Sequence, residues 1–229
     1  LIDPTGENPA YDMAGNFLGC TSEGFTGMIM IYTGTEKIDP TKYSLSDLQN
    51  HLGDYLITYD VARKSNKVNM THEAHSKLWT HVASQFEGTH VYDEIFSMSS
   101  INGGKIGFQN ADMASWATEF YPNRPDIKPK IIGTGGYDYE STVENIALSI
   151  IVHEWYSHGM KHVRNKYRSH RLAYKNVINF KMLWNKATDR YKRFILNELL
   201  EYTTKETGRK TVDKLYRSLY YRYVIKYGK

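Results

Sequence analysis

Apolar side chains recur every four positions between residues 71 and 87, and this spacing places them on one face of a helix. These residues are Ala74, Leu78, Val82 and Phe86. A shorter helix is predicted over residues 44–54, because Ser44 is a suitable N-cap and Asp47 stands at the third helical position. A β-prone run over residues 24–33 predicts a strand.

The most apolar stretch of the chain predicts a helix that begins near Ser141. Ser141 and Glu144 fit the capping box S-x-x-E, in which each side chain pairs with an amide of the first turn. The apolar residues that follow occupy adjoining stripes, so we expect this helix to be buried over a wide arc at the centre of a domain. They are Val143, Ile146, Ala147, Ile150 and Ile151.

Short β-prone segments and further helices complete the pattern. Glycines around residues 103–108 indicate a hairpin or bulged strand, and residues 130–133 indicate another strand. From Arg168 the pattern is helical almost to the end, with a break at Gly208. We therefore predict an α+β fold, in which a small β-sheet lies beside a mainly helical C-terminal half with a central helix.

Composition excludes several classes of protein. The 229 residues are 41% apolar and 24% charged, which is typical of a globular domain and not of a disordered chain. No uncharged apolar stretch approaches the ~20 residues of a membrane helix, and no signal segment is evident, so a soluble protein is expected. The single cysteine, Cys20, excludes an intramolecular disulfide and a cysteine-rich zinc site, so any metal must be bound by His, Asp or Glu.

Two histidines and a glutamate lie near the end of the predicted central helix. In the zinc-protease pattern H-E-x-x-H, histidines four apart share one helix face, but His153 and His158 are five apart. On a regular helix, five residues turn ~500° and leave the two rings ~140° apart. We therefore predict a single-turn π-bulge between His153 and Gly159, which would restore the convergence of the rings. Glu154 is the candidate general base.

A catalytic zinc site usually has three protein ligands and an open fourth position. His170 is the preferred third ligand, because it opens the next helical run, twelve residues after His158. His162 would share the short helix with the first two ligands, which constrains the coordination geometry. Glu198 is an alternative third ligand, and Glu201 is a further candidate.

The motif His153-Glu-x-x-x-His158-Gly159 resembles the zinc helix of the dipeptidyl peptidase III family, whose zincin motif is H-E-x-x-x-H-G. In that family the third ligand is a Glu followed three positions later by Ala. The segment His170-Arg-Leu-Ala173 repeats this spacing with His in place of Glu, after a much shorter connection. The resemblance covers about twenty residues. It implies a zincin-like zinc metallopeptidase, without dipeptidase specificity.

A second resemblance concerns the N-terminal residues. Ile2-Asp-Pro-Thr-Gly6 and Tyr11-Asp-Met-Ala-Gly-Asn-Phe-Leu-Gly19 resemble the end of the Rhs/YD-repeat core, which precedes a variable C-terminal toxin domain in Rhs-type proteins of Bacteroidetes. This implies an effector that a specialised bacterial secretion system secretes or delivers into a target cell, and a cognate immunity protein. Residues 1–22 are accordingly expected to be an Rhs-core-like tail or linker, and residues 23–229 the metallopeptidase domain.

Together these features predict Zn²⁺ held by His153, His158 and His170, with Glu154 as general base for peptide hydrolysis. A polypeptide substrate would add as a strand along the edge formed by residues 106–108 or 130–133. The alternative is a nuclease toxin, because the net charge is +4 and the tail is shared by such toxins. A module with a structural metal is a third hypothesis.

Other conspicuous motifs are interpreted as structural. His72-Glu-Ala-His75 has histidines three apart and is predicted to be a solvated helix face. Residues 214–226 interleave basic and aromatic residues as nucleic-acid binders do, but an amphipathic packing helix is the preferred interpretation. Its apolar stripe would comprise Leu215, Leu219 and Tyr223.

Overall fold

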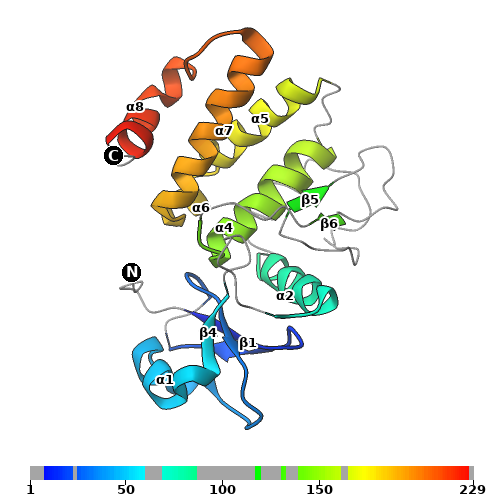
Figure 1. Cartoon of the computed structure of the whole chain (residues 1–229), viewed down its shortest axis with the longest axis vertical. Helices are drawn as coiled ribbons and strands as arrows, with labels where there is room; N and C mark the ends of the chain where they lie inside the picture. The colour runs from blue at the N-terminus through cyan, green and yellow to red at the C-terminus, as the bar shows by residue number, and fades with distance from the viewer. Residues whose placement is uncertain are drawn as a thin grey trace.

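The computed structural model describes residues 8–22, 25–59, 69–86, 117–119, 130–132, 139–160 and 165–226. An N-terminal sheet with one flanking helix occupies one end of the molecule, and the C-terminal helices are stacked beyond it (Figure 1). This arrangement confirms the α+β prediction, with a small sheet beside a mainly helical C-terminal half.

Four short strands form the N-terminal sheet in the order β2-β1-β3-β4. They are β1 (Pro9–Asp12), β2 (Phe17–Cys20), β3 (Met30–Tyr32) and β4 (Leu56–Thr58). Strand β1 pairs parallel with β3, and the other neighbours are antiparallel. The segment expected to be a linker thus contributes strands β1 and β2 to this sheet. Two residues of β1, Ala10 and Tyr11, are completely buried. Described residues 8–22 belong to the folded domain.

The turn between β1 and β2 packs closely on helix α2 (His72–Ser84). Gly15 has a φ of 76° in this turn, and a Cβ at this position would collide with the carbonyl oxygen of Ala74. Only glycine meets both demands without strain. Ala74, Leu78 and Val82 are buried as their four-residue spacing predicts.

Helix α1 (Leu45–Leu52) begins as predicted. The Ser44 hydroxyl caps it by accepting a hydrogen bond of 3.1 Å from the Asp47 amide. Short 3₁₀ turns precede and follow it, at η1 (Pro40–Lys42) and η2 (Gly53–Tyr55).

The polar interpretation of the His72/His75 motif is wrong for His75. Its side chain is buried, and its Nδ1 lies 2.7 Å from the hydroxyl of Tyr59. The same hydroxyl accepts a hydrogen bond of 2.7 Å from Trp79 Nε1. These polar atoms satisfy one another inside the core, so a histidine can be buried there without a large desolvation penalty.

A second, two-stranded sheet consists of β5 (Ala117–Glu119) and β6 (Lys130–Ile132), which pair antiparallel. The strand predicted at residues 130–133 is thereby confirmed at 130–132. The glycine-rich segment 103–108 lies outside the described residues.

The central helix begins as α4 (Val143–Ala147) and continues as the π-helix η4 (Leu148–Met160). It is buried on a wide arc as expected, since residues 143–148 and 150–152 are all buried. The predicted capping box is wrong by one position, because Thr142 is the N-cap and its hydroxyl accepts from the Asn145 amide. The Glu144 carboxylate turns away from the helix and accepts from the Gly27 amide, at 3.1 Å, and from the Thr26 hydroxyl.

The remaining helices follow the predicted helical pattern. They are α5 (Lys166–Asn179), α6 (Lys181–Lys186), α7 (Asp189–Thr207), η5 (Lys214–Tyr216), α8 (Arg217–Tyr220) and η6 (Tyr221–Lys226). Gly208 ends α7 in a left-handed conformation with φ 72°, as its position predicts. The final segment is a succession of 3₁₀, α and π turns, and Leu215 is consequently 74% exposed instead of lying on the buried stripe.

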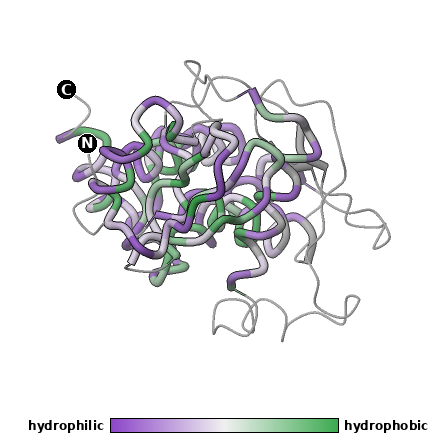
Figure 2. Tube along the Cα trace, turned by 90° about the horizontal axis from the view of Figure 1, so that it is seen from below, coloured by the Kyte–Doolittle hydropathy of each residue, from purple (hydrophilic) through white to green (hydrophobic). Residues whose placement is uncertain are grey.

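One large core joins both halves of the molecule. It contains buried side chains of β1, β3, α2, the central helix, α5 and α7. Apolar and hydrophilic stretches alternate along the trace, as expected of amphipathic elements around a shared core (Figure 2). No helix among the described residues is long and apolar enough to cross a membrane.

Candidate metal centre

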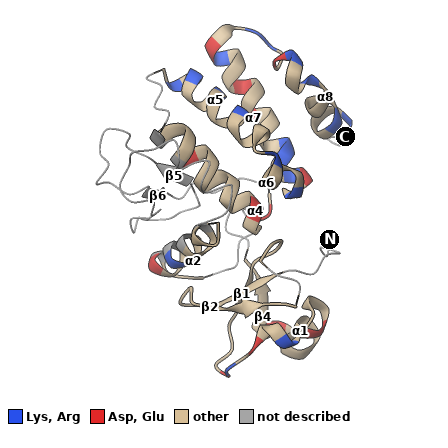
Figure 3. Cartoon of the chain, turned by 180° about the vertical axis from the view of Figure 1, so that it is seen from behind, with Lys and Arg blue, Asp and Glu red and all other residues tan. Residues whose placement is uncertain are grey.

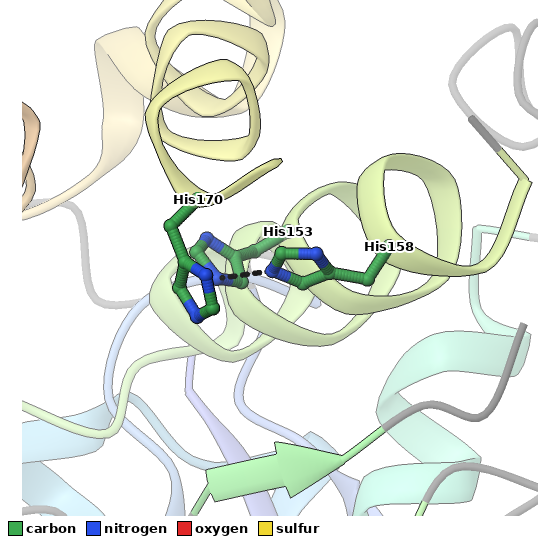
Figure 4. A group of neighbouring side chains, drawn as sticks. All are labelled: His153, His158 and His170. Carbon is green, nitrogen blue, oxygen red and sulfur yellow. Dashed lines mark hydrogen bonds between the residues drawn. The ribbon is translucent and has the colours of Figure 1, made fainter. Parts of the chain in front are cut away.

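Three histidines from two helices converge where the first turn of α5 packs against η4. His153 and His158 project from η4, and His170 projects from α5 toward the same point (Figure 4). One ring nitrogen of each lies within 4.8 Å of the corresponding nitrogens of the other two. The residues predicted from sequence as metal ligands are therefore close enough to bind one ion.

The π-helix makes this convergence possible for residues five apart. A π-helix closes its backbone hydrogen bonds between residues i and i+5, so His153 and His158 lie about one turn apart on the same face of the helix. The Ser157 hydroxyl follows the same geometry and donates to the Val152 carbonyl oxygen at 2.7 Å. The predicted single-turn bulge is too short, since the π geometry spans 13 residues. Buried neighbours around this helix supply the packing that holds the wider turns.

The spacing of the two nitrogens on η4 suits a tetrahedral metal ion. His153 Nε2 and His158 Nε2 lie 3.3 Å apart. Two nitrogen ligands of a tetrahedral zinc, each about 2.0–2.1 Å from the metal, are separated by about 3.3–3.4 Å. The donor set also fits, because three imidazoles leave the fourth position open for water or substrate.

The first turn of α5 orients two of the three rings. His170 Nδ1 lies 3.0 Å from the carbonyl oxygen of Lys166, which can only accept, so Nδ1 carries the proton and Nε2 keeps its lone pair. His158 Nδ1 lies 2.9 Å from the Ser169 hydroxyl, which leaves Nε2 facing His153. Hydrogen bonds of this kind to the distal nitrogen are typical of metal-binding histidines.

Two tyrosines form the aromatic wall of the cluster. The Tyr202 ring stacks on His170 with a centroid distance of 4.6 Å and an interplanar angle of 10°. The Tyr174 ring packs against His153 at 4.6 Å, and its hydroxyl donates to Glu198 at 3.3 Å. No sequence pattern singles out Tyr202. Its position four residues after Glu198 on α7 gives no local signal of contact with α5.

Burial keeps the histidines neutral. Desolvation, reinforced by the neighbouring His158 and His170, lowers the pKa of His153 well below its ordinary value. Burial and the charge of His170 lower the pKa of His158 to about 4, and burial also lowers the pKa of His170. Neutral imidazole is the form that binds a metal, so at neutral pH no proton has to be displaced.

Glu154 lies beside the cluster without belonging to it. Its Oε1 is 3.9 Å from His153 Nε2, and its side chain is 16% exposed. The group of mutually close ligand atoms includes no carboxylate among the described residues. Glu198 contacts the site through the Tyr174 hydroxyl. Burial raises the pKa of the Glu198 carboxyl. His162 lies outside the described residues.

Strand β5 packs against η4, so the two-stranded sheet adjoins the helix that carries His153 and His158 (Figure 1). The chain matches no protein-family model, no curated protein and no solved structure. The function must therefore be inferred from the site itself.

Proposed function

We propose that this protein is a zinc-dependent metallopeptidase with a zincin-like catalytic helix. The observation that carries the proposal is the convergence of His153, His158 and His170, with the Glu154 carboxylate 3.9 Å from the first of them. Three neutral nitrogen ligands and an adjacent carboxylate are the components of a hydrolytic zinc site.

His153, His158 and His170 would hold the ion through one nitrogen each. Zinc supplies a Lewis acid that polarises the scissile carbonyl and lowers the pKa of a water toward ~7. Imidazole nitrogens favour zinc, copper, iron or nickel over magnesium and calcium, which prefer oxygen ligands.

Glu154 is the proposed general base. It accepts the proton of the attacking water and returns it to the nitrogen of the leaving amine, so that its charge is restored at the end of the cycle. Glu154 directly follows His153 on η4, and its carboxylate oxygen 3.9 Å from His153 Nε2 supports this role.

The substrate is proposed to be an extended polypeptide. Strand β5 contacts η4, and an added strand at the edge of the β5–β6 sheet would run beside the histidines. Backbone hydrogen bonds would then hold the peptide while the scissile bond faces Glu154.

The N-terminal sequence motifs, residues 2–6 and 11–19, support a role as the C-terminal effector domain of an Rhs-type polymorphic toxin. Residues 11–19 of the second motif form strands β1 and β2 of the domain, so the junction with an Rhs-like core would precede them. We propose secretion or delivery into a target cell, with a cognate immunity protein as partner.

The test combines metal analysis with assays of the Glu154→Gln variant. Purified without a histidine tag, the protein should contain near-stoichiometric zinc by plasma mass spectrometry. Glu154→Gln should keep the zinc and lose 10²–10⁴-fold of proteolysis, which is the usual contribution of general acid–base catalysis. Zinc-dependent cleavage of DNA or RNA without proteolysis would establish the nuclease alternative. Unchanged proteolysis in Glu154→Gln would contradict the mechanism.

A further inference from the structure

The C-terminal segment carries a small apolar cavity on the surface of the molecule. Its volume is about 220 Å³, and it lies between α7, the connection after Gly208 and the final helical turns. Leu200, Val212, Tyr220 and Ile225 contribute its apolar wall. We call this cavity the C-terminal pocket.

Exposed large hydrophobic side chains are concentrated in the segment that forms the C-terminal pocket, and two of them, Tyr221 and Ile225, line it. Seven such side chains are exposed among the described residues, and three of them belong to residues 215–225. They are Leu215 at 74%, Tyr221 at 64% and Ile225 at 47% exposure. Such a concentration of exposed apolar side chains is typical of an interaction site.

The segment that forms the C-terminal pocket is strongly cationic. Residues 209–226 contain six Lys or Arg and one acid, Asp213, which is already paired with Lys175 and Arg171. Figure 3 shows the basic residues recurring along α8 and the end of the chain. Lys210 and Arg217 line the C-terminal pocket, and neither has a carboxylate partner in the part of the chain that the structure describes.

A second depression extends this cationic character. It has a volume of about 450 Å³ and is lined by Arg222 and Lys226, with one acid, Asp189. Tyr221 lines both depressions and therefore separates them. A ligand that crosses Tyr221 would meet the apolar pocket on one side and further positive charge on the other.

The size of the C-terminal pocket limits what can fill it. Small-molecule sites usually measure ≈ 300–1,000 Å³, so this cavity is small for a whole ligand. A single aliphatic or aromatic side chain of a partner is an appropriate occupant, because protein interfaces commonly insert one such anchor into a pocket. Positive charges beside the pocket would favour acidic neighbours of that anchor.

We propose that the C-terminal pocket and its cationic surroundings are a docking site for an acidic segment of another protein, which inserts one apolar side chain. A nucleic acid would satisfy Lys210 and Arg217 but has no apolar side chain for the pocket. Besides the two cations, the groups of the pocket lining that could recognise the edge of a base are the hydroxyls of Thr211, Tyr220 and Tyr221, and the rest of its wall is apolar. The proposal is independent of the metal centre.

The test is fluorescence anisotropy on the full chain with a labelled peptide of Glu and Asp that contains one central Phe. Two matched peptides serve as controls. In the first, Ser replaces Phe and the charge is unchanged. In the second, Gln and Asn replace Glu and Asp, and Phe is retained. The Phe-containing acidic peptide should bind at least tenfold more tightly than either. Oligo-dT serves as the nucleic-acid probe.

Variants assign the binding to this face. Lys210→Glu combined with Arg217→Glu should weaken the acidic Phe peptide about tenfold or more, and rising salt should weaken it further. Lys37→Glu, an exposed charge reversal in the N-terminal half, is the matched control and should leave binding unchanged. Ile225→Ser should weaken the Phe peptide about tenfold and the Ser peptide little.

Three results would overturn the proposal. The first is equal binding of the Phe and Ser peptides. The second is absence of acidic-peptide binding in a chain shown to be folded by circular dichroism. The third is an equal loss of binding in Lys37→Glu and in the variant that combines Lys210→Glu with Arg217→Glu. Tight binding of oligo-dT that depends on Lys210 and Arg217 would assign the face to nucleic acid instead.

Discussion

His153 Nε2 and His158 Nε2 lie 3.3 Å apart although five residues separate them in the chain. A regular α-helix would place the two rings on different faces. The π-helix over Leu148–Met160 brings them together, and α5 adds His170 from outside this helix. Helix geometry and the packing of α5 on η4 thus jointly create the cluster.

Removal of the hydrogen bond to His158 should weaken metal binding without abolishing it. The Ser169 hydroxyl contacts His158 Nδ1 at 2.9 Å, and loss of such a partner typically costs 10–100-fold in metal affinity. We expect Ser169→Ala to show this loss in a competition titration with a chromophoric zinc chelator, and His170→Ala to lose zinc altogether. Ser46→Ala, at an exposed position of α1, is the control. Equal affinities of Ser169→Ala and wild type would contradict the geometry.

The metal-free protein should be unusually sensitive to mild acid. Burial lowers the pKa of His158 to about 4, whereas an unfolded histidine has a pKa near 6.5. The unfolded state therefore binds more protons between these values, and the free energy of unfolding falls as pH falls through this window. The loss is on the order of 3 kcal/mol for His158 alone.

Urea unfolding of chelator-treated protein at several pH values checks this expectation. His158→Asn should flatten the dependence between about pH 6.5 and 4, because that group no longer titrates. A pH profile identical to that of the wild type would show that His158 is not the group responsible.

Glu144 should stabilise the junction between the sheet and the central helix. Its buried carboxylate accepts from the Gly27 amide and the Thr26 hydroxyl. Glu144→Ala leaves the Gly27 amide without this acceptor and should cost about 1–3 kcal/mol in urea unfolding. Glu144→Gln retains an acceptor oxygen and should cost less. A larger loss of unfolding free energy in Glu144→Gln than in Glu144→Ala would show that these hydrogen bonds are not the cause of the stabilisation.

Truncation to alanine should destabilise the protein strongly at one leucine of the C-terminal half and hardly at another. Leu215 is 74% exposed, whereas Leu199 on α7 is completely buried. Leu199→Ala should lower the free energy of unfolding by about 2–5 kcal/mol, and Leu215→Ala should change it by less than about 0.5 kcal/mol. Denaturant titrations measure both. A large loss of unfolding free energy in Leu215→Ala would instead support the packed amphipathic helix that the sequence predicts.

Local signals were the most accurate guides to this fold. Ser44 caps α1 because its hydroxyl reaches an amide only three residues away, and Gly208 ends α7 because it tolerates positive φ. The four-residue spacing of Ala74, Leu78 and Val82 likewise identified the buried face of α2. In each case the deciding interaction or repeat lies within a few residues.

Local patterns mislead where the deciding partner is distant in the chain. The sequence predicts a local capping box for Glu144, but the partners of its carboxylate stand 117 and 118 residues away. It predicts a solvated His75, yet the Tyr59 hydroxyl pairs with this side chain inside the core. Tyr202 gave no signal, because its contact with His170 depends on how α7 packs against α5.

The sequence by itself determined the residue types of the site: its histidines, its glutamate and a spacing of five, at which two histidines do not share a face of a regular α-helix. It left His170, His162, Glu198 and Glu201 open as third ligands, because any later residue can return to a helix. Only the tertiary structure brought His170 to the other two, set the length of the π-helix and withdrew the rings far enough from solvent to keep them neutral. Packing between distant segments decides these properties, and no local pattern encodes it.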